Sequence, residues 1–119
     1  KGARVGVLGL TFKENVSDIR NSKVPDIIKE LQEFGIQPML FDPFADPAET
    51  HHEYGLHITA LSEFTNLDAL IVAVSHKQFL AMTPDELMKR VKNHGVIVDV
   101  KSALDPAAFP SSRVSYWCL

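Results

Sequence analysis

Residues 4–22 read RVGVLGLTFKENVSDIRNS, and the interpretation of the whole chain starts from this stretch. Its apolar run at residues 5–10 contains two glycines and predicts a buried strand. A polar loop follows at residues 11–21, and Ser22 then offers an N-cap for a helical pattern. The stretch therefore joins the carboxyl end of a first strand to the amino end of a first helix.

The loop at residues 11–21 occupies the place where ligands bind in open α/β sheets, beyond the carboxyl ends of the strands. Backbone N–H groups and the helix dipole favour an anion at the start of a helix. Lys13 and Arg20 add two cations to this loop, so a phosphate-bearing ligand is one interpretation. The other is a solvated loop whose charges only increase solubility, and the residues alone leave both interpretations open.

The segment GLTFKENVSDIRNSKVPDII at residues 9–28 is similar to the start of the C-terminal domain of the UDP-glucose/GDP-mannose dehydrogenase family. The pattern F-K-x-x-x-x-D-x-R-x-S carries this resemblance from Phe12 to Ser22. Three later features agree with it, and they are FDP at 41–43, VSH at 74–76 and VDVK at 98–101. The resemblance covers nearly the whole chain.

Members of this family are nucleotide-sugar 6-dehydrogenases, which oxidise the C6 alcohol of the sugar to a carboxylate with two NAD. The resemblance implies that residues 1–119 form a single UDP-binding C-terminal domain. Its first loop is most similar to those of enzymes that act on UDP-N-acetylhexosamines in capsule or O-antigen synthesis. The N-terminal domain of the same chain would hold NAD and the nucleophilic cysteine. The fragment alone, with no catalytic residue, is therefore expected to be inactive.

The resemblance also implies roles for four residues. Lys13 would contact the nucleotide-sugar, with Phe12 packing the loop against this ligand. Arg20 would reach the NAD held by the N-terminal domain. Lys101 would reach the nucleotide-sugar of a neighbouring subunit, which implies a homodimer or a higher homo-oligomer. Many relatives have arginine at that last position, and lysine cannot form the same bidentate fork.

The composition predicts one globular domain, with 45% hydrophobic and 23% charged residues. The net charge of −3 does not favour nucleic-acid binding, and no apolar run approaches the roughly 18–20 residues that span a bilayer. The single cysteine, Cys118, excludes an internal disulfide and predicts a cytoplasmic protein. We expect its side chain to pack, because no activating base is near it in the sequence. Lys1 in place of methionine suggests a fragment of a longer protein.

Hydrophobic periodicity predicts the remaining elements. Strands are expected at 39–41, 57–58, 69–74, 96–98 and 114–117. Helices are expected at 24–34, 47–54, 61–65 and 76–81, from Thr83 to Gly95, and as a turn from Asp105. Because strand, helix and strand alternate within about 40 residues, the sheet should be parallel. The predicted fold class is α/β, a three-layer α/β/α Rossmann-like parallel sheet that lacks the GxGxxG fingerprint.

That fingerprint needs a tight glycine turn after the first strand, whereas Gly9 is followed here by Leu-Thr-Phe-Lys. We therefore reject a self-contained NAD site and interpret the glycines as positions where a helix or loop approaches closely. Asp42 stands where a dinucleotide fold places its ribose-binding acid, but an Asp-Pro turn is the preferred interpretation. For His76, a proton shuttle is weighed against a structural histidine bonded to a loop carbonyl, and the structural role is preferred.

The remaining polar clusters predict no chemistry. His51, His52 and His57 with Glu53 lack the spacing that places ligands on one helix face, so no metal site is predicted. Two other function classes stay open. A stand-alone nucleotide-binding regulatory module would lack catalytic activity. A phosphorelay receiver domain would need a cluster of acids after the first strand, where residues 10–13 provide none.

Overall fold

The computed structural model describes residues 3–11, 15, 17–20 and 22–118. These residues form one parallel sheet in the order β2-β1-β3-β4-β5, which confirms the α/β Rossmann-like prediction. The strands are β1 (Val5–Leu8), β2 (Met39–Phe41), β3 (Leu67–Val72), β4 (Val91–Asp99) and β5 (Val114–Cys118). The helices are α1 (Val24–Glu33), α2 (Pro47–Tyr54), α3 (Lys77–Leu80) and α4 (Pro84–Lys89), with 3-10 turns η1 (Leu61–Glu63) and η2 (Pro106–Ala108).

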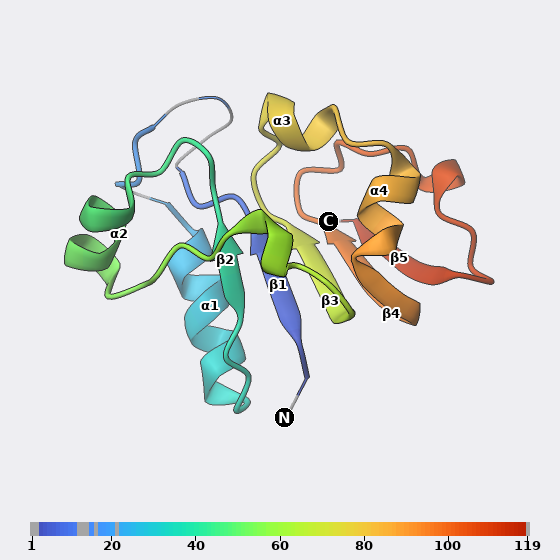
Figure 1. The fold of residues 1–119 in the computed structure, drawn as a ribbon, viewed down its shortest axis with the longest axis horizontal. Helices are drawn as coiled ribbons and strands as arrows, with labels where there is room; N and C mark the ends of the chain where they lie inside the picture. The colour runs from blue at the N-terminus through green and yellow to red at the C-terminus, as the bar shows by residue number, and fades with distance from the viewer. Residues whose placement is uncertain (1–2, 12–14, 16, 21, 119) are drawn as a thin grey trace.

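Both faces of the sheet are apolar, as expected for buried parallel strands. Val5 and Val7 of β1 share a core with Ile28 of α1. Leu8, which points to the other face, shares a separate core with Leu87 of α4. Figure 1 shows α1 beside β1 and β2, α4 beside β4, and α3 beyond the carboxyl ends of the strands. Helices on opposite faces thus leave the carboxyl edge and its loops to hold a site.

The two glycines of the first strand segment allow close approach, as predicted. A Cβ atom built on Gly6 would lie 2.7 Å from ring atoms of Phe64, which follows η1. A Cβ atom on Gly9 would lie 2.6 Å from the Cβ of Val74, and Gly9 has a φ of +104°. Glycine is therefore needed at both positions for the loops to pack against β1.

Helix starts agree with the sequence where a capping residue was recognised. Asp46 accepts a hydrogen bond from the N–H of Glu49 at the start of α2. Thr83 and Glu86 form a reciprocal capping box at the start of α4. Ser22, however, lies one residue before the N-cap of α1, which is Lys23. No helix among the described residues is long and apolar enough to cross a membrane.

The predicted helix from Thr83 to Gly95 is wrong in its second half. Helix α4 ends at Lys89, and β4 begins at Val91, which is buried on a strand instead of on a helix. Val91 pairs with Leu67 of β3, and this strand pairing decides its conformation although its spacing from Leu87 and Met88 is helical. The register between β3 and β4 then shifts before the pairing resumes at Ala69.

Three smaller predictions also need correction. The predicted strand at 57–58 does not form, although the N–H of Thr59 donates to the carbonyl of Leu40. The first strand ends at Leu8 instead of residue 10, and the strand predicted at 69–74 runs from Leu67 to Val72.

Candidate functional site

A hollow of about 180 Å³ lies at the carboxyl edge of the sheet. Its walls come from the loop after β1, the first turn of α1, and the segments after β3 and β4. Thr11 comes from the loop after β1, and Ser22 and Val24 come from the start of α1. Val74 follows β3, and Lys101 follows β4. The hollow therefore joins parts of the chain that the sequence had placed on one rim.

The start of α1 gives this hollow a positive character. Lys23 at the N-cap makes no side-chain cap, whereas the hydroxyl of Ser22 accepts from the N–H of Val24 at 3.1 Å and donates to the carbonyl of Leu10. Lys23 and Lys101 add two cations to the lining. A helix start with nearby cations suits a phosphate or another anion.

Lys101 lies in the turn that follows β4, at the carboxyl end of the strand as the sequence predicted, and its side chain is exposed. The turn is held by Asp99, whose buried carboxylate accepts from the N–H of Leu104 at 2.8 Å and from the hydroxyl of Tyr116 at 2.6 Å. Burial and the hydrogen bond to Asp99 raise the pKa of Tyr116, so this phenol stays protonated as a donor. Sequence reasoning missed this support, although an acid at the end of an apolar strand is a signal for it.

Arg20 is also exposed, and its guanidinium lies against Asp18, with Nε 3.1 Å from the carboxylate Oδ1. The hydrogen bond from Arg20 lowers the pKa of Asp18. Between them, Ile19 is buried, and its carbonyl accepts from the hydroxyl of Tyr54 on α2. The loop is thus anchored at Ile19 while Arg20 faces outward. Phe12 and Lys13 lie outside the described residues.

Asp42, at the end of β2, is 2% exposed and bonded on both oxygens. Its Oδ1 accepts from the N–H of Phe44, which confirms the predicted turn, and its Oδ2 accepts from the N–H groups of Leu10 and Thr11. Burial acts to raise the pKa of Asp42, but hydrogen bonds from His76 and these three N–H groups outweigh it and lower the pKa. Because the carboxylate is used inside the protein, this position does not fit the ribose of a dinucleotide.

His76 is fully buried and has a structural role, but its predicted partner is wrong. Its Nε2 lies 2.8 Å from Oδ2 of Asp42 and 3.1 Å from the hydroxyl of Thr11, and neither contact is with a loop carbonyl. Its Nδ1 accepts from the N–H of Asn15 at 2.8 Å. Asn15, which sequence reasoning missed, has a φ of +60° that asparagine tolerates better than most residues.

Two other candidate positions contribute no site. Cys118 is exposed on the edge strand β5, which corrects the expectation that its side chain packs. The rings of His51 and His57 stack with centroids 4.8 Å apart. Within the described ranges, no group of three or more histidine, cysteine or acidic side chains could hold a metal ion.

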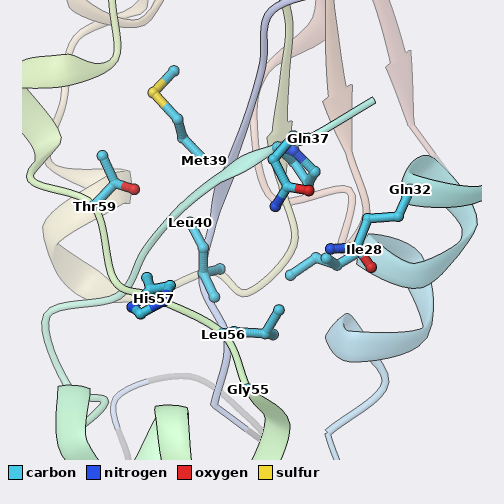
Figure 2. Close-up of a pocket in the computed structure, with 10 residues that line it drawn as sticks. Ile28, Gln32, Gln37, Met39, Leu40, Gly55, Leu56, His57 and Thr59 are labelled. Atoms are coloured by element: carbon cyan, nitrogen blue, oxygen red, sulfur yellow. The ribbon is translucent and has the colours of Figure 1, made fainter. Parts of the chain in front are cut away.

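A second hollow of about 270 Å³ lies along the outer side of β2. Figure 2 shows Ile28 of α1 pointing toward Leu40 and Leu56, with Gln37 and His57 at the sides. This hollow contains none of the residues predicted to bind a ligand, and it lies away from the carboxyl edge. We therefore take the smaller hollow beside Lys101 as the candidate site.

Comparisons with known proteins identify the family of the chain. The model of the UDP-glucose/GDP-mannose dehydrogenase family, UDP binding domain, matches residues 6–106. UDP-N-acetyl-D-glucosamine 6-dehydrogenase of Pseudomonas aeruginosa is 42% identical over 104 residues, which cover 87% of this chain and 25% of that protein. Protein CapL of Staphylococcus aureus is 39% identical over 105 residues, which cover 88% of this chain and 24% of that protein.

Solved structures give the same relationship. The crystal structure of NDP-N-acetyl-D-galactosaminuronic acid dehydrogenase from Methanosarcina mazei Go1 matches with a TM-score of 0.87 at 25% sequence identity. The match covers 99% of this chain and 24% of that chain. The chain thus spans about a quarter of the length of the relatives that it matches.

Proposed function

The chain belongs to the UDP-glucose/GDP-mannose dehydrogenase family, and on that basis we propose that it is the UDP-sugar-binding C-terminal domain of a longer NAD-dependent 6-dehydrogenase. The match of the family's UDP-binding model to residues 6–106 carries this proposal. We propose a UDP-N-acetylhexosamine as the substrate, for capsule or O-antigen synthesis. The similarity to the Pseudomonas aeruginosa enzyme and to CapL supports this choice.

In this proposal the hollow at the carboxyl edge holds the diphosphate of the nucleotide. The first turn of α1 provides N–H groups and the positive end of a helix dipole, which favour the phosphate charge. Lys13 binds the nucleotide-sugar and Phe12 packs against it. Lys101 lies at the edge of this hollow and is exposed, and in a homodimer or higher homo-oligomer it reaches the nucleotide-sugar of a neighbouring subunit, so the first turn of α1 and Lys23 provide the positive charge for the diphosphate in its own subunit.

In this proposal the N-terminal domain of the same chain would hold most of the NAD, which would supply the hydride acceptor for oxidation of the sugar. Arg20 contributes to that cofactor from this domain, since its side chain is exposed and oriented by Asp18. Asp42 has no part in cofactor binding, because its oxygens are bonded inside the protein. The isolated chain is expected to be inactive. We propose the cytoplasm as the place of the reaction, because a single cysteine is typical of a reducing compartment.

Calorimetric titration of the full-length protein separates the two loop cations. Truncating a charged hydrogen-bonding partner costs roughly 1.5–3 kcal/mol, which is about a 10- to 150-fold loss of affinity. Lys13→Ala should therefore weaken UDP-sugar binding much more than NAD binding, and Arg20→Ala should do the reverse. Lys29→Ala, on the exposed side of α1, is the matched control and should change neither affinity. Parent-like binding of both ligands by both variants would show that the loop is only a solvated connection.

A further inference from the structure

The buried pair of Asp42 and His76 connects three separate parts of the carboxyl edge. Asp42 directly follows β2, and His76 comes after β3 as the N-cap of α3. Both contact the loop after β1, because Thr11 bonds to Asp42 and His76, and Asn15 bonds to His76. The side chain of Asn15 continues the connection, since its Oδ1 accepts from the N–H of Lys77 at 2.7 Å.

The hydrogen bonds determine the protonation of the ring. Because the backbone N–H of Asn15 can only donate, Nδ1 of His76 must be an unprotonated acceptor. Nε2 then carries the hydrogen and donates to the carboxylate of Asp42. His76 is therefore neutral, with its hydrogen on Nε2. An imidazolium would place a second N–H against the N–H of Asn15.

The contacts of His76 involve the loop that is proposed to bind the nucleotide-sugar. Thr11 and Asn15 flank the segment 12–14, which contains the two proposed nucleotide-sugar contacts Phe12 and Lys13. Both flanking residues bond to the same buried ring. His76 therefore connects Asp42 after β2 with two described residues of this loop, Thr11, which lines the hollow beside Lys101, and Asn15.

We propose that neutral His76, held by Asp42, is a positioning residue that sets the loop after β1 for nucleotide-sugar binding. This inference rests on the proposed function, because it assigns the loop to that ligand. The rings of Phe44 and Phe79 pack on His76, with centroids 4.7 and 5.4 Å away. Asp42 is the charged group that contacts the ring among the described residues, and Lys77, the next residue, is exposed.

Three variants separate positioning from simple packing. His76→Phe keeps a ring but removes the hydrogen bonds to Asp42, Thr11 and Asn15. His76→Asn removes the bond to Asp42 but places a carbonyl oxygen near the position of Nδ1, where it can accept from Asn15. Ile97→Val, in the core on the α4 face, is a stability control that leaves the loop contacts in place.

UDP is the probe, and its affinity for the chain is measured by calorimetry beside the thermal midpoint of each variant. We expect His76→Phe to raise the Kd about tenfold, because the loop loses its hydrogen bonds to the ring, and His76→Asn to recover part of that loss. Ile97→Val should lower the thermal midpoint without changing the Kd. An unchanged Kd in His76→Phe, or equal losses in His76→Phe and His76→Asn, would overturn the positioning role.

A readout without ligand separates failure of this inference from failure of the proposed function. Long-range nitrogen–proton spectra should show Nδ1 of His76 unprotonated, and the Asn15 amide should exchange slowly with solvent and faster in His76→Phe. If these hold but the parent chain does not bind UDP, the function assigned to the loop is wrong. A protonated Nδ1, or a rapidly exchanging Asn15 amide in the parent, would overturn the inference itself.

Discussion

Asp42 shows how one side chain can organise the edge of a sheet. Its sequence context, Asp-Pro after an apolar run, indicates only a turn. In the folded chain the same carboxylate also accepts hydrogen bonds from Leu10, Thr11 and His76, which lie more than 30 residues away in the sequence. A buried carboxylate with this many donors is stable only while all of them remain in place.

We expect Asp42→Asn to lower the free energy of unfolding by about 3 kcal/mol, because an amide N–H₂ would face backbone donors. Asp46→Asn is the matched control, since Asp46 also precedes a proline but is exposed, and asparagine caps a helix equally well. Urea unfolding at neutral pH measures both. Similar losses in the two variants would show that the contacts of Asp42 contribute no special stability.

The same variants should differ in their response to acid. Because the pKa of Asp42 is lowered in the folded state, its contribution is present above the unfolded value of 3.8 and is lost as the pH falls through the lower, folded value. The difference in unfolding free energy between the parent and Asp42→Asn should therefore shrink below about pH 4. A difference that stays constant from pH 7 to pH 2 would contradict the lowered pKa.

At the scale of elements, the sequence predicted what local chemistry decides. Capping residues located the starts of α2 and α4, and the apolar runs located the strands. The end of α4 was misplaced because Leu87, Met88 and Val91 follow helical spacing, and only pairing with β3 shows that Val91 belongs to a strand. The rim around Lys101 was predicted because the carboxyl ends of parallel strands share one edge of the sheet. The contacts among Asp42, His76 and Asn15 were not predicted, because they join three segments that are distant in the sequence.

Helix α4 is short, so its capping box should contribute much of its local stability. Thr83→Ala removes the acceptor for the N–H of Glu86 and should lower the free energy of unfolding by about 1 kcal/mol. Thr65→Ala, an exposed threonine outside the helices, is the control. Chemical denaturation compares them, and a Thr83→Ala variant as stable as its control would show that α4 is held by its buried face alone.

At the scale of the whole molecule, one sheet separates two possible binding regions. The carboxyl edge carries the first turn of α1, the loop after β1 and the turn that presents Lys101. The outer side of β2 carries the second hollow, where Gln37 and His57 are among the lining residues and none of the described ones is a lysine or arginine. Charge and family membership together favour the carboxyl edge for a nucleotide diphosphate.

Titration of the isotope-labelled chain with UDP, followed through its backbone amide resonances, tests this assignment most directly. The proposed site predicts saturable shifts at Thr11, Asn15 and Lys101 and in the first turn of α1, with Gln37 and His57 unchanged. Shifts confined to the hollow beside β2 would contradict nucleotide binding at the carboxyl edge. The absence of saturable shifts at UDP concentrations well above the dissociation constant expected for a nucleotide-binding domain would contradict it as well.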